Sequence, residues 1–369
     1  MKTFRRQSLL WAVWLLSGFA APAGCRCGAP FAEGEARHVI DAHTHIALGA
    51  GATAAEIFSR SGIDVAVNLV GRPYGPRLLA HLQEAAAVSE RYPNVEILVF
   101  AGIDWRLVDE PDFGELAAKD LRRAHAAGAR GLKVFKSLGL GVQTGEGRLL
   151  AVDDARLDPI WKTAGELGMP VAIHTGDPLA FFQPPTPDNE RWEELHAHPS
   201  WSFYGEPYPS LDELMAARDR MVAKHPQTDF LAVHFGGYPE DIEAVAASMR
   251  RHPNLWIDLA ARLPEIGRHK VGAVRAFFDE FQDRILMGTD IQISPTNVVL
   301  GSAGEDEIHS PEDAARYYDV HWRYLESRDT NMPHVTPIQG RWSINGIGLE
   351  RQVLNKIYRD NARRLLRRK

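Results

Sequence analysis

The sequence predicts an α/β protein in which a parallel sheet closes into a (β/α)8 barrel. Short apolar segments rich in β-branched residues alternate with longer amphipathic segments along most of the chain, as in repeated β–α units. Eight such apolar segments can be counted, which is the number of strands in this barrel. The alternative is an open doubly wound sheet, but no Gly-x-Gly-x-x-Gly follows the first segment.

The expected elements are bounded by residues that stop helices. Leu167-Gly168-Met169-Pro170, for example, lies between a helical pattern and the next strand. We expect strands at residues 39–46, 63–70, 95–103, 129–135, 169–175, 229–235, 254–259 and 284–289. We expect helices at residues 77–92, 115–127, 159–167, 210–225, 239–251 and 271–281.

Length and composition are those of an ordinary globular protein. The chain has 369 residues, of which 45% are hydrophobic and 24% charged, so it can bury a large core. Its formal net charge is −6, and no basic stripe is interleaved with aromatic residues, which argues against nucleic-acid binding. The oligomeric state is left open, a homo-oligomer included.

Residues 1–24 have the features of a secretory signal peptide. A basic start precedes an apolar run that is too short to span a membrane comfortably, and an Ala-x-Ala site ends at Ala23. Arg5-Arg6 resembles a twin-arginine signal, and Ala23-Gly24-Cys25 resembles a bacterial lipobox. An ordinary Sec signal is the alternative to both. We therefore predict export, either to the periplasm or to a membrane through a lipid on Cys25.

The rest of the chain is predicted to be a linker at residues 25–37 and one barrel domain at residues 38–369. The only cysteines, Cys25 and Cys27, are separated by one residue, which is a poor geometry for a disulfide between them. The folded body therefore offers a metal ion only His, Asp, Glu or a modified Lys.

Two segments do not fit the β–α repeat. Residues 177–209 follow the fifth strand and are rich in Pro and aromatic residues, including Trp201 and Tyr204. A long loop leaving this end of a barrel strand often builds a site, so we interpret it as a lid or substrate wall; a loop merely packed on the barrel is the alternative. Residues 291–369 form a C-terminal extension with helices expected at 311–327 and 350–366.

Ionisable residues fall where several predicted strands end. His43 and His45 end the first strand, His174 the fifth and His234 the sixth, and Asp290 follows the eighth. In a (β/α)8 barrel these ends converge on one face, where catalytic groups collect. Burying so many titratable groups without a cation would be costly. The pattern therefore predicts a divalent metal site.

Side-chain alternation in strands gives two finer predictions. In the first strand, Asp41 should lie on the same face as His43 and His45. Small residues two positions before the other strand-end groups should face inward and leave room for a metal and a substrate: Ala172, Ala232 and Gly288.

These residues together resemble the amidohydrolase superfamily. More narrowly, they resemble its amidohydrolase-related branch, which includes aminocarboxymuconate-semialdehyde decarboxylase and the resorcylate decarboxylases. The resemblance extends from residue 39 to residue 366 and rests on these motifs: Asp41-x-His43-x-His45, the strand-end His174 and His234, and Gly288-Thr289-Asp290. It implies one divalent ion, expected to be Zn²⁺, on four ligands: His43, His45, His174 and Asp290.

The resemblance also implies chemical roles. Asp290 would be the general base for a metal-activated water, and His234 would polarise the substrate carbonyl or pass a proton. Lys133 lies in the fourth strand, where binuclear members carry a carboxylated lysine that bridges two metals, so a second ion on His174 and His234 is the alternative. A lysine that pairs with a carboxylate or binds an anionic substrate is a third interpretation.

The predicted function is metal-dependent hydrolysis of an amide, lactone or ester carbonyl in a small substrate, which could carry a carboxylate. Non-oxidative decarboxylation of an aromatic or unsaturated acid at the same site is the alternative. A lipid-tethered binding protein that keeps the metal without turnover is the third. Substrate contacts are expected from five residues: Asn68, Arg72, Trp201, Tyr204 and Arg262.

Overall fold

The computed structural model describes residue 31 and residues 35–70, 74–205, 207–301, 309–334, 336 and 339–367. The predicted signal peptide, the lipobox cysteine Cys25 and the predicted substrate contact Arg72 lie outside the described residues. None of the described helices is both long enough and apolar enough to cross a membrane.

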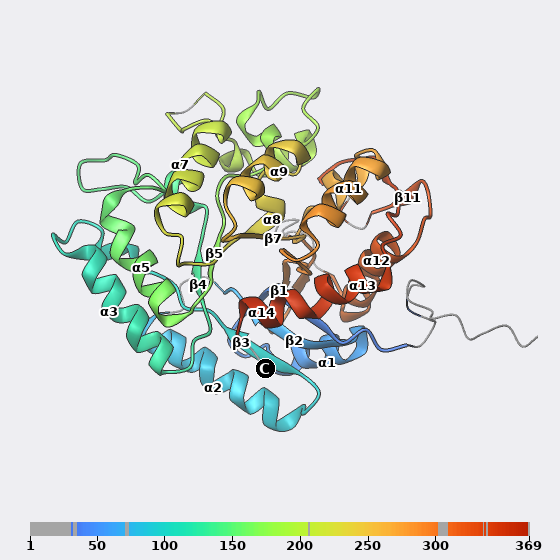
Figure 1. Cartoon of the computed structure of the whole chain (residues 1–369), viewed down its shortest axis with the longest axis horizontal. Helices are drawn as coiled ribbons and strands as arrows, with labels where there is room; N and C mark the ends of the chain where they lie inside the picture. Colours follow the sequence, from blue (N-terminus) through green and yellow to red (C-terminus); the bar gives the residue numbers. More distant parts are fainter. Residues whose placement is uncertain are drawn as a thin grey trace, which may run out of the picture.

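Eight strands run parallel around a common axis (Figure 1). They are β1 (Val39–Ile46), β2 (Ile63–Asn68), β3 (Glu96–Val99), β4 (Leu132–Val134), β5 (Val171–Ile173), β6 (Phe230–Ala232), β7 (Leu255–Asp258) and β8 (Ile285–Leu286). One parallel sheet joins β1 to β3 and another joins β4 to β8. A parallel bridge between Ala101 and Leu132 links the two sheets, and Ala42 N donates to Met287 O at 2.9 Å to close the ring. The predicted (β/α)8 fold is confirmed.

Helices cover the outside of the barrel between these strands. They are α1 (Gly51–Ser61), α2 (Gly75–Arg91), α3 (Phe113–Ala126), α5 (Asp158–Leu167), α7 (Leu211–Lys224), α9 (Ile242–Arg251) and α11 (Val271–Phe281). Local sequence explains their ends. Ser210 and Glu213 form a reciprocal capping box at the start of α7. Gly168, with φ +66°, ends α5 in the left-handed conformation that glycine adopts without strain.

The apolar core has two layers. Side chains such as Ile40, Val67, Leu231 and Leu286 fill the inside of the barrel, and a larger set packs between the strands and the helices. Helix α14 (Asn361–Leu365) contributes Ala362 and Leu365 to the inner layer. The inside of the barrel is therefore a packed core, and polar groups gather where the strands end.

The insertion after β5 contains the short helices η3 (Leu179–Phe182), α6 (Trp192–Ala197) and η4 (Pro199–Trp201). The C-terminal extension contains β9 (Ile291–Ile293), β10 (Val298–Val299), α12 (Pro311–Glu326), β11 (Met332–Pro333), β12 (Ser343–Ile344) and α13 (Arg351–Asn355). Strand β9 pairs in parallel with β1. The helix expected at residues 350–366 is interrupted by a π-helical turn (Lys356–Asp360), within which Ile357 O accepts a hydrogen bond from Met287 N.

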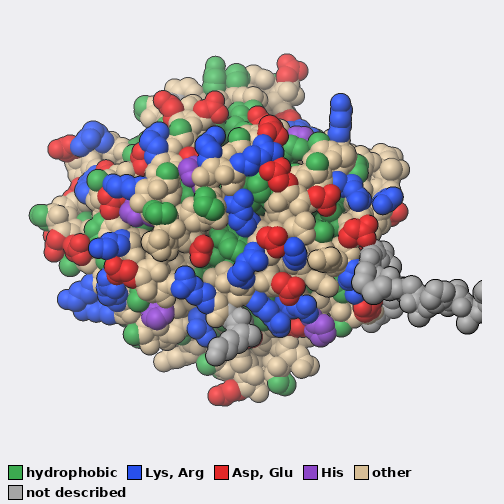
Figure 2. Space-filling model, viewed as in Figure 1, with side chains coloured by type: hydrophobic (Ala, Val, Ile, Leu, Met, Phe, Trp, Pro, Cys, Tyr) green, Lys and Arg blue, Asp and Glu red, His purple; other side chains and the backbone are tan. Residues whose placement is uncertain are grey.

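The surface has no single dominant charge on the face shown in Figure 2. Basic and acidic side chains are interspersed there. The expected lack of a nucleic-acid partner stays a prediction.

Candidate active site

Asp41 does not share a face with His43 and His45, so this prediction was wrong. The pairing of β1 with β2 shifts register between Asp41 and Thr44, and such a bulge breaks strict alternation. The carboxylate of Asp41 accepts from Thr289 Oγ1 at 2.6 Å and from Tyr318 OH at 2.7 Å. Because Tyr318 lies on the outer helix α12, Asp41 ties β1 to that helix.

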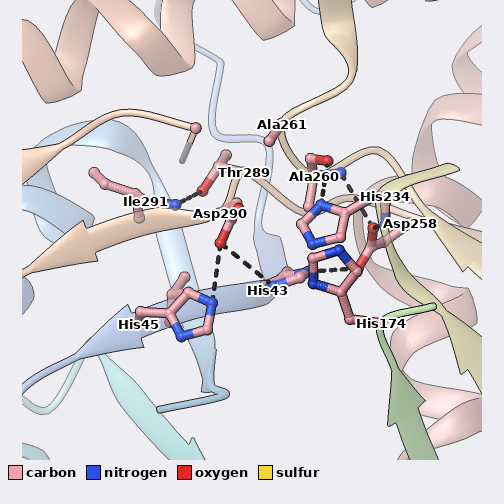
Figure 3. A network of polar contacts seen from close by, with 12 residues as sticks. His43, His45, His174, His234, Asp258, Ala260, Ala261, Thr289, Asp290 and Ile291 are labelled. Atoms are coloured by element: carbon pink, nitrogen blue, oxygen red, sulfur yellow. Dashed lines mark hydrogen bonds and ion pairs between the residues drawn. The ribbon is translucent and has the colours of Figure 1, made fainter. Parts of the chain in front are cut away.

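The two histidines of β1 converge on Asp290 (Figure 3). Oδ1 of Asp290 lies 3.0 Å from His45 Nε2 and 3.4 Å from His43 Nε2. The backbone of Asp290 has φ +61°, a strained conformation of the kind found at functional sites. At Gly288 an added Cβ would lie 3.1 Å from His43 Cβ and 3.3 Å from Asp258 Cβ, so glycine makes room for these two side chains; room for a metal and a substrate there stays a prediction.

His234 follows β6 in a left-handed turn, with φ 60° and ψ 52°. This turn overturns the expectation for Ala232, which packs in the outer layer rather than facing the site. His234 N donates to Asp258 Oδ1 at 2.7 Å, and His234 Nδ1 lies 2.9 Å from Ala260 O. Because a carbonyl oxygen can only accept, Nδ1 carries the proton and Nε2 has a free lone pair.

Asp258 connects two of the histidines (Figure 3). Its Oδ2 lies 2.9 Å from His43 Nδ1, while its Oδ1 accepts from His234 N and from Ala260 N. A carboxylate partner at Nδ1 fixes the proton there and leaves Nε2 of His43 as the ligand atom. The predicted ligand set omitted Asp258, although it ends the apolar strand β7 as the histidines end theirs.

His174 lies beside His234, with the two ring centroids 4.2 Å apart. Its Nε2 lies 3.5 Å from Asp177 Oδ1. The other carboxylate oxygen of Asp177 accepts from Lys136 Nζ at 2.5 Å. Asp177 therefore joins the start of the insertion to the loop after β4.

Lys133 points into the same cluster. It is 2% exposed, and its Nζ lies 3.5 Å from His43 Nε2. Burial lowers the pKa of Lys133 to about 8, although the carboxylates of Asp290 and Asp258 oppose this shift. An inward lysine is the arrangement on which the two-metal alternative depends.

Burial decides the charge state of the histidines. It lowers the pKa of His43, lowers that of His174 to about 4, and lowers that of His234 well below its ordinary value. Burial raises the pKa of the Asp290 carboxyl, but the neighbouring His43 and His45 outweigh this effect and hold that pKa well below the ordinary value. His43, His174 and His234 are therefore neutral and Asp290 is ionised near pH 7.

This donor set fits a divalent metal ion. One ligand atom each from His43, His234 and Asp290 lies within 4.8 Å of the others, and all three residues are buried. Neutral imidazole nitrogens and a carboxylate are the ligands of zinc and similar ions. The structure thus groups His234 with His43 and Asp290, whereas the resemblance implies His174 rather than His234 as a metal ligand.

A cavity of about 690 Å³ opens at this cluster. Its wall includes His45, Lys133, His174, His234 and Asp290, together with residues of the insertion and the C-terminal extension. This volume suits a small molecule. The cavity therefore lies at the carboxyl ends of the strands, where (β/α)8 barrels build their sites.

The predicted substrate contacts differ in placement. Trp201 and Arg262 line the cavity. Tyr204 is 51% exposed and is not part of the cavity wall. The amide of Asn68 bonds the main chain of Ile46, which gives it a position between β1 and β2 outside the cavity.

A closed barrel with a buried histidine and aspartate cluster at the strand ends defines the class of protein, a (β/α)8-barrel enzyme with a metal-binding site. A family model described as "Amidohydrolase" matches residues 40–368. The chain belongs to this amidohydrolase family, and the resemblance seen in the sequence is confirmed. No curated protein matches the sequence.

Solved structures share the fold. An uncharacterized TIM-barrel protein from Bordetella bronchiseptica is 16% identical with a TM-score of 0.51, and the match covers 89% of this chain and 98% of that one. A 2,6-dihydroxybenzoate decarboxylase solved with 2,6-dihydroxybenzoate is 17% identical with a TM-score of 0.50, covering 89% and 99%. A dihydroxybenzoic acid decarboxylase from Polaromonas sp. JS666, with bound manganese and 2-nitroresorcinol, is 16% identical with a TM-score of 0.50, covering 89% and 97%.

Proposed function

We propose that this enzyme hydrolyses an amide, lactone or ester carbonyl in a small substrate with the help of one divalent cation. The observation that carries the proposal is the convergence of His43 Nε2 and His45 Nε2 on Asp290 Oδ1, at 3.4 and 3.0 Å, beside the cavity that His45 and Asp290 line. Membership of the amidohydrolase family supports the same chemistry.

The cation would be held by Asp290, His43 and His45, with one further histidine. A bound divalent cation polarises a carbonyl oxygen and lowers the pKa of a coordinated water. The fourth ligand is His174 on the resemblance, whereas the ligand-atom distances favour His234. We expect Zn²⁺, and the inward Lys133 keeps a second ion as the alternative.

Asp290 and His234 would carry out different proton transfers. The ionised carboxylate of Asp290 accepts a proton from the attacking water, as a general base close to the reacting atoms. When His174 is the fourth ligand, neutral His234 can accept a proton at Nε2 because its Nδ1 donates to Ala260 O; when His234 is the fourth ligand, Nε2 binds the cation and takes no proton. In this tautomer it passes a proton rather than donating a hydrogen bond to the substrate carbonyl, which narrows the two roles expected from the sequence.

The test is turnover on a panel of esters, lactones and amides with metal-replete protein. Asp290→Asn removes the base, so we expect turnover to fall by about 100-fold or more with little change in folding. Asp120→Asn is the matched control, because Asp120 pairs with Arg123 on the exposed face of α3. Unchanged turnover in Asp290→Asn would dismiss Asp290 as the base.

Non-oxidative decarboxylation is the second candidate. Two of the structures with the same fold are decarboxylases of dihydroxybenzoates, but identities of 16–17% support the fold alone. Release of carbon dioxide from an aromatic acid, measured beside release of acid from a lactone or ester, separates the two reactions. Carbon dioxide release without hydrolysis would replace the first proposal by the second.

A further inference from the structure

Arg262 is a buried base on the cavity wall that the proposed chemistry does not use. It follows strand β7 and immediately precedes helix α10 (Leu263–Arg268). Arg262 is 5% exposed, and it lines the same cavity as Asp290 and His234. A buried charge without a partner is costly, so the contacts of this guanidinium decide what it can bind.

One edge of the Arg262 guanidinium is free. Within the described residues this side chain makes one hydrogen bond, from Nη1 to Ala261 O at 2.8 Å. Nε and Nη2 have no partner among those residues, and neither belongs to the unpartnered polar atoms that are shut off from solvent. Because Arg262 lines the cavity, this edge faces it. Nε and Nη2 together can bind a carboxylate through two parallel hydrogen bonds, as the same nitrogens of Arg156 bind Asp154, each at 3.0 Å.

The carboxylates near Arg262 are bound by another base. Arg191, from the insertion, donates to Glu194 at 2.7 Å and also to Glu265 at the start of α10. Burial raises the pKa of Glu194, and the charges of Arg191 and Arg262 oppose this rise. Arg262 therefore attracts Glu194, but within the described residues it forms no ion pair with a carboxylate. Its positive charge is left without a close partner.

The other acids on the cavity wall also have basic partners. Asp177 accepts from Lys136 Nζ at 2.5 Å, and Asp290 faces the two histidines of β1. Lys133, which likewise forms no ion pair within the described chain, contacts the histidine cluster instead. Arg262 is therefore the base that the wall offers to an anion away from the proposed metal ligands.

We propose that Arg262 binds a carboxylate of the substrate, separate from the carbonyl that reacts, through Nε and Nη2. The proposal rests on the proposed function, because it places this carboxylate in the same cavity as the reacting carbonyl and so makes the substrate a small acid. A single guanidinium edge balances one negative charge, which favours a carboxylate over a doubly charged phosphate. Hydrogen bonds between two charged groups are also the strongest that this wall can offer.

The experiment measures binding of two probes, benzoate and benzamide, by titration calorimetry with the purified, metal-replete, full-length protein. Phe181 and Trp201 line the same cavity and offer apolar contact to the ring of either probe. Wild type should bind benzoate about tenfold more tightly than benzamide, because only benzoate is charged. Arg262→Gln should weaken benzoate binding by about 10- to 100-fold and benzamide binding much less.

Three further variants control this result. Arg262→Lys keeps the charge but lacks the planar fork, so it should lose about tenfold in benzoate affinity, and it carries the test if Arg262→Gln does not fold. Gln292→Leu changes another side chain of the cavity wall, on β9. Arg123→Gln removes a positive charge from the exposed face of α3. Both of these variants should keep the wild-type affinities, and thermal unfolding checks the fold of each protein.

Three results would overturn the proposal. The first is wild-type benzoate affinity in a folded Arg262 variant. The second is a wild type that binds benzoate no more tightly than benzamide, or not at all. The third is benzoate binding that is lost in His45→Ala but kept in Arg262→Gln, which would place the anion on the metal instead. Because binding of these probes does not require turnover, failure of the hydrolase proposal leaves this result readable, and the reverse.

Discussion

Replacing Asp258 by Asn should weaken metal binding without unfolding the barrel. In the wild type, Asp258 Oδ2 lies 2.9 Å from His43 Nδ1, and Oδ1 accepts from His234 N at 2.7 Å and Ala260 N at 3.2 Å. An asparagine oxygen can keep the two main-chain bonds. Its NH2 group would face His43 Nδ1 and could only donate to it, so the imidazole proton would move to Nε2.

A proton on Nε2 of His43 should weaken metal binding because of the position of this atom in the site. That atom lies 3.4 Å from Asp290 Oδ1, at the centre of the proposed metal site. A protonated nitrogen cannot bind a cation, so the variant must return His43 to the less stable tautomer before it binds. Loss of such a partner typically lowers metal affinity by about 10- to 100-fold, or about 1.4–2.7 kcal/mol.

The assay is a competition titration of Zn²⁺ against a chelator of known affinity, for wild type, Asp258→Asn and the surface control Asp120→Asn. The ¹⁵N chemical shifts of the His43 ring report the tautomer directly, and a purely structural role would not move them. Thermal unfolding checks that the fold is kept. Wild-type affinity together with an unchanged tautomer in Asp258→Asn would refute the reasoning.

Three further predictions test other parts of the account. His174→Ala and His234→Ala should differ in metal content by elemental analysis: the variant that loses the ion identifies the fourth ligand, and retention in both would contradict a histidine there. Burial and the neighbouring Glu265 raise the pKa of Glu240 to about 6. Between the ordinary value of 4.5 and about 6 the folded state binds more protons, so stability falls as pH rises through this window. Glu240→Gln removes this pH-dependent loss. Its free energy of unfolding, measured relative to that of wild type, should therefore be about 1–2 kcal/mol higher at pH 7 than at pH 5. An equal pH dependence of urea unfolding in both proteins would oppose this. Finally, Cys25→Ala should move the protein from the membrane to the soluble fraction of cells, and an unchanged distribution would rule out a lipid anchor at this residue.

Much of the barrel could be predicted from the sequence because each strand is buried on both faces and therefore forms a short apolar run. The residues that follow these runs also identified most of the cluster. His43, His45, His234 and Asp290 come together because parallel strands of a barrel end on one side.

Alternation within a strand was a less reliable guide. It failed at Asp41, where β1 has a bulge, and at Ala232, because His234 leaves the strand in a left-handed turn. Both departures depend on contacts with distant residues, such as the bond from His234 N to Asp258. A local pattern contains no information about such contacts.

The remaining site residues come from pairs far apart in the sequence. Arg191 meets Glu265 across 74 positions, and Gln339 reaches the cavity from the C-terminal extension. The length and composition of the insertion predicted a substrate wall, but no sequence pattern pairs Arg191 with Glu265 or assigns Gln339 to the cavity. Such positions are set by tertiary packing, which only the folded structure reveals.

The central claim is that the buried histidines and Asp290 exist to hold a cation. Elemental analysis of purified wild type and His45→Ala, beside the Asp120→Asn control, tests it most directly. The account predicts about one divalent ion per chain in wild type and the control, and a clear loss in His45→Ala with the fold retained. Full metal stoichiometry in His45→Ala would contradict it.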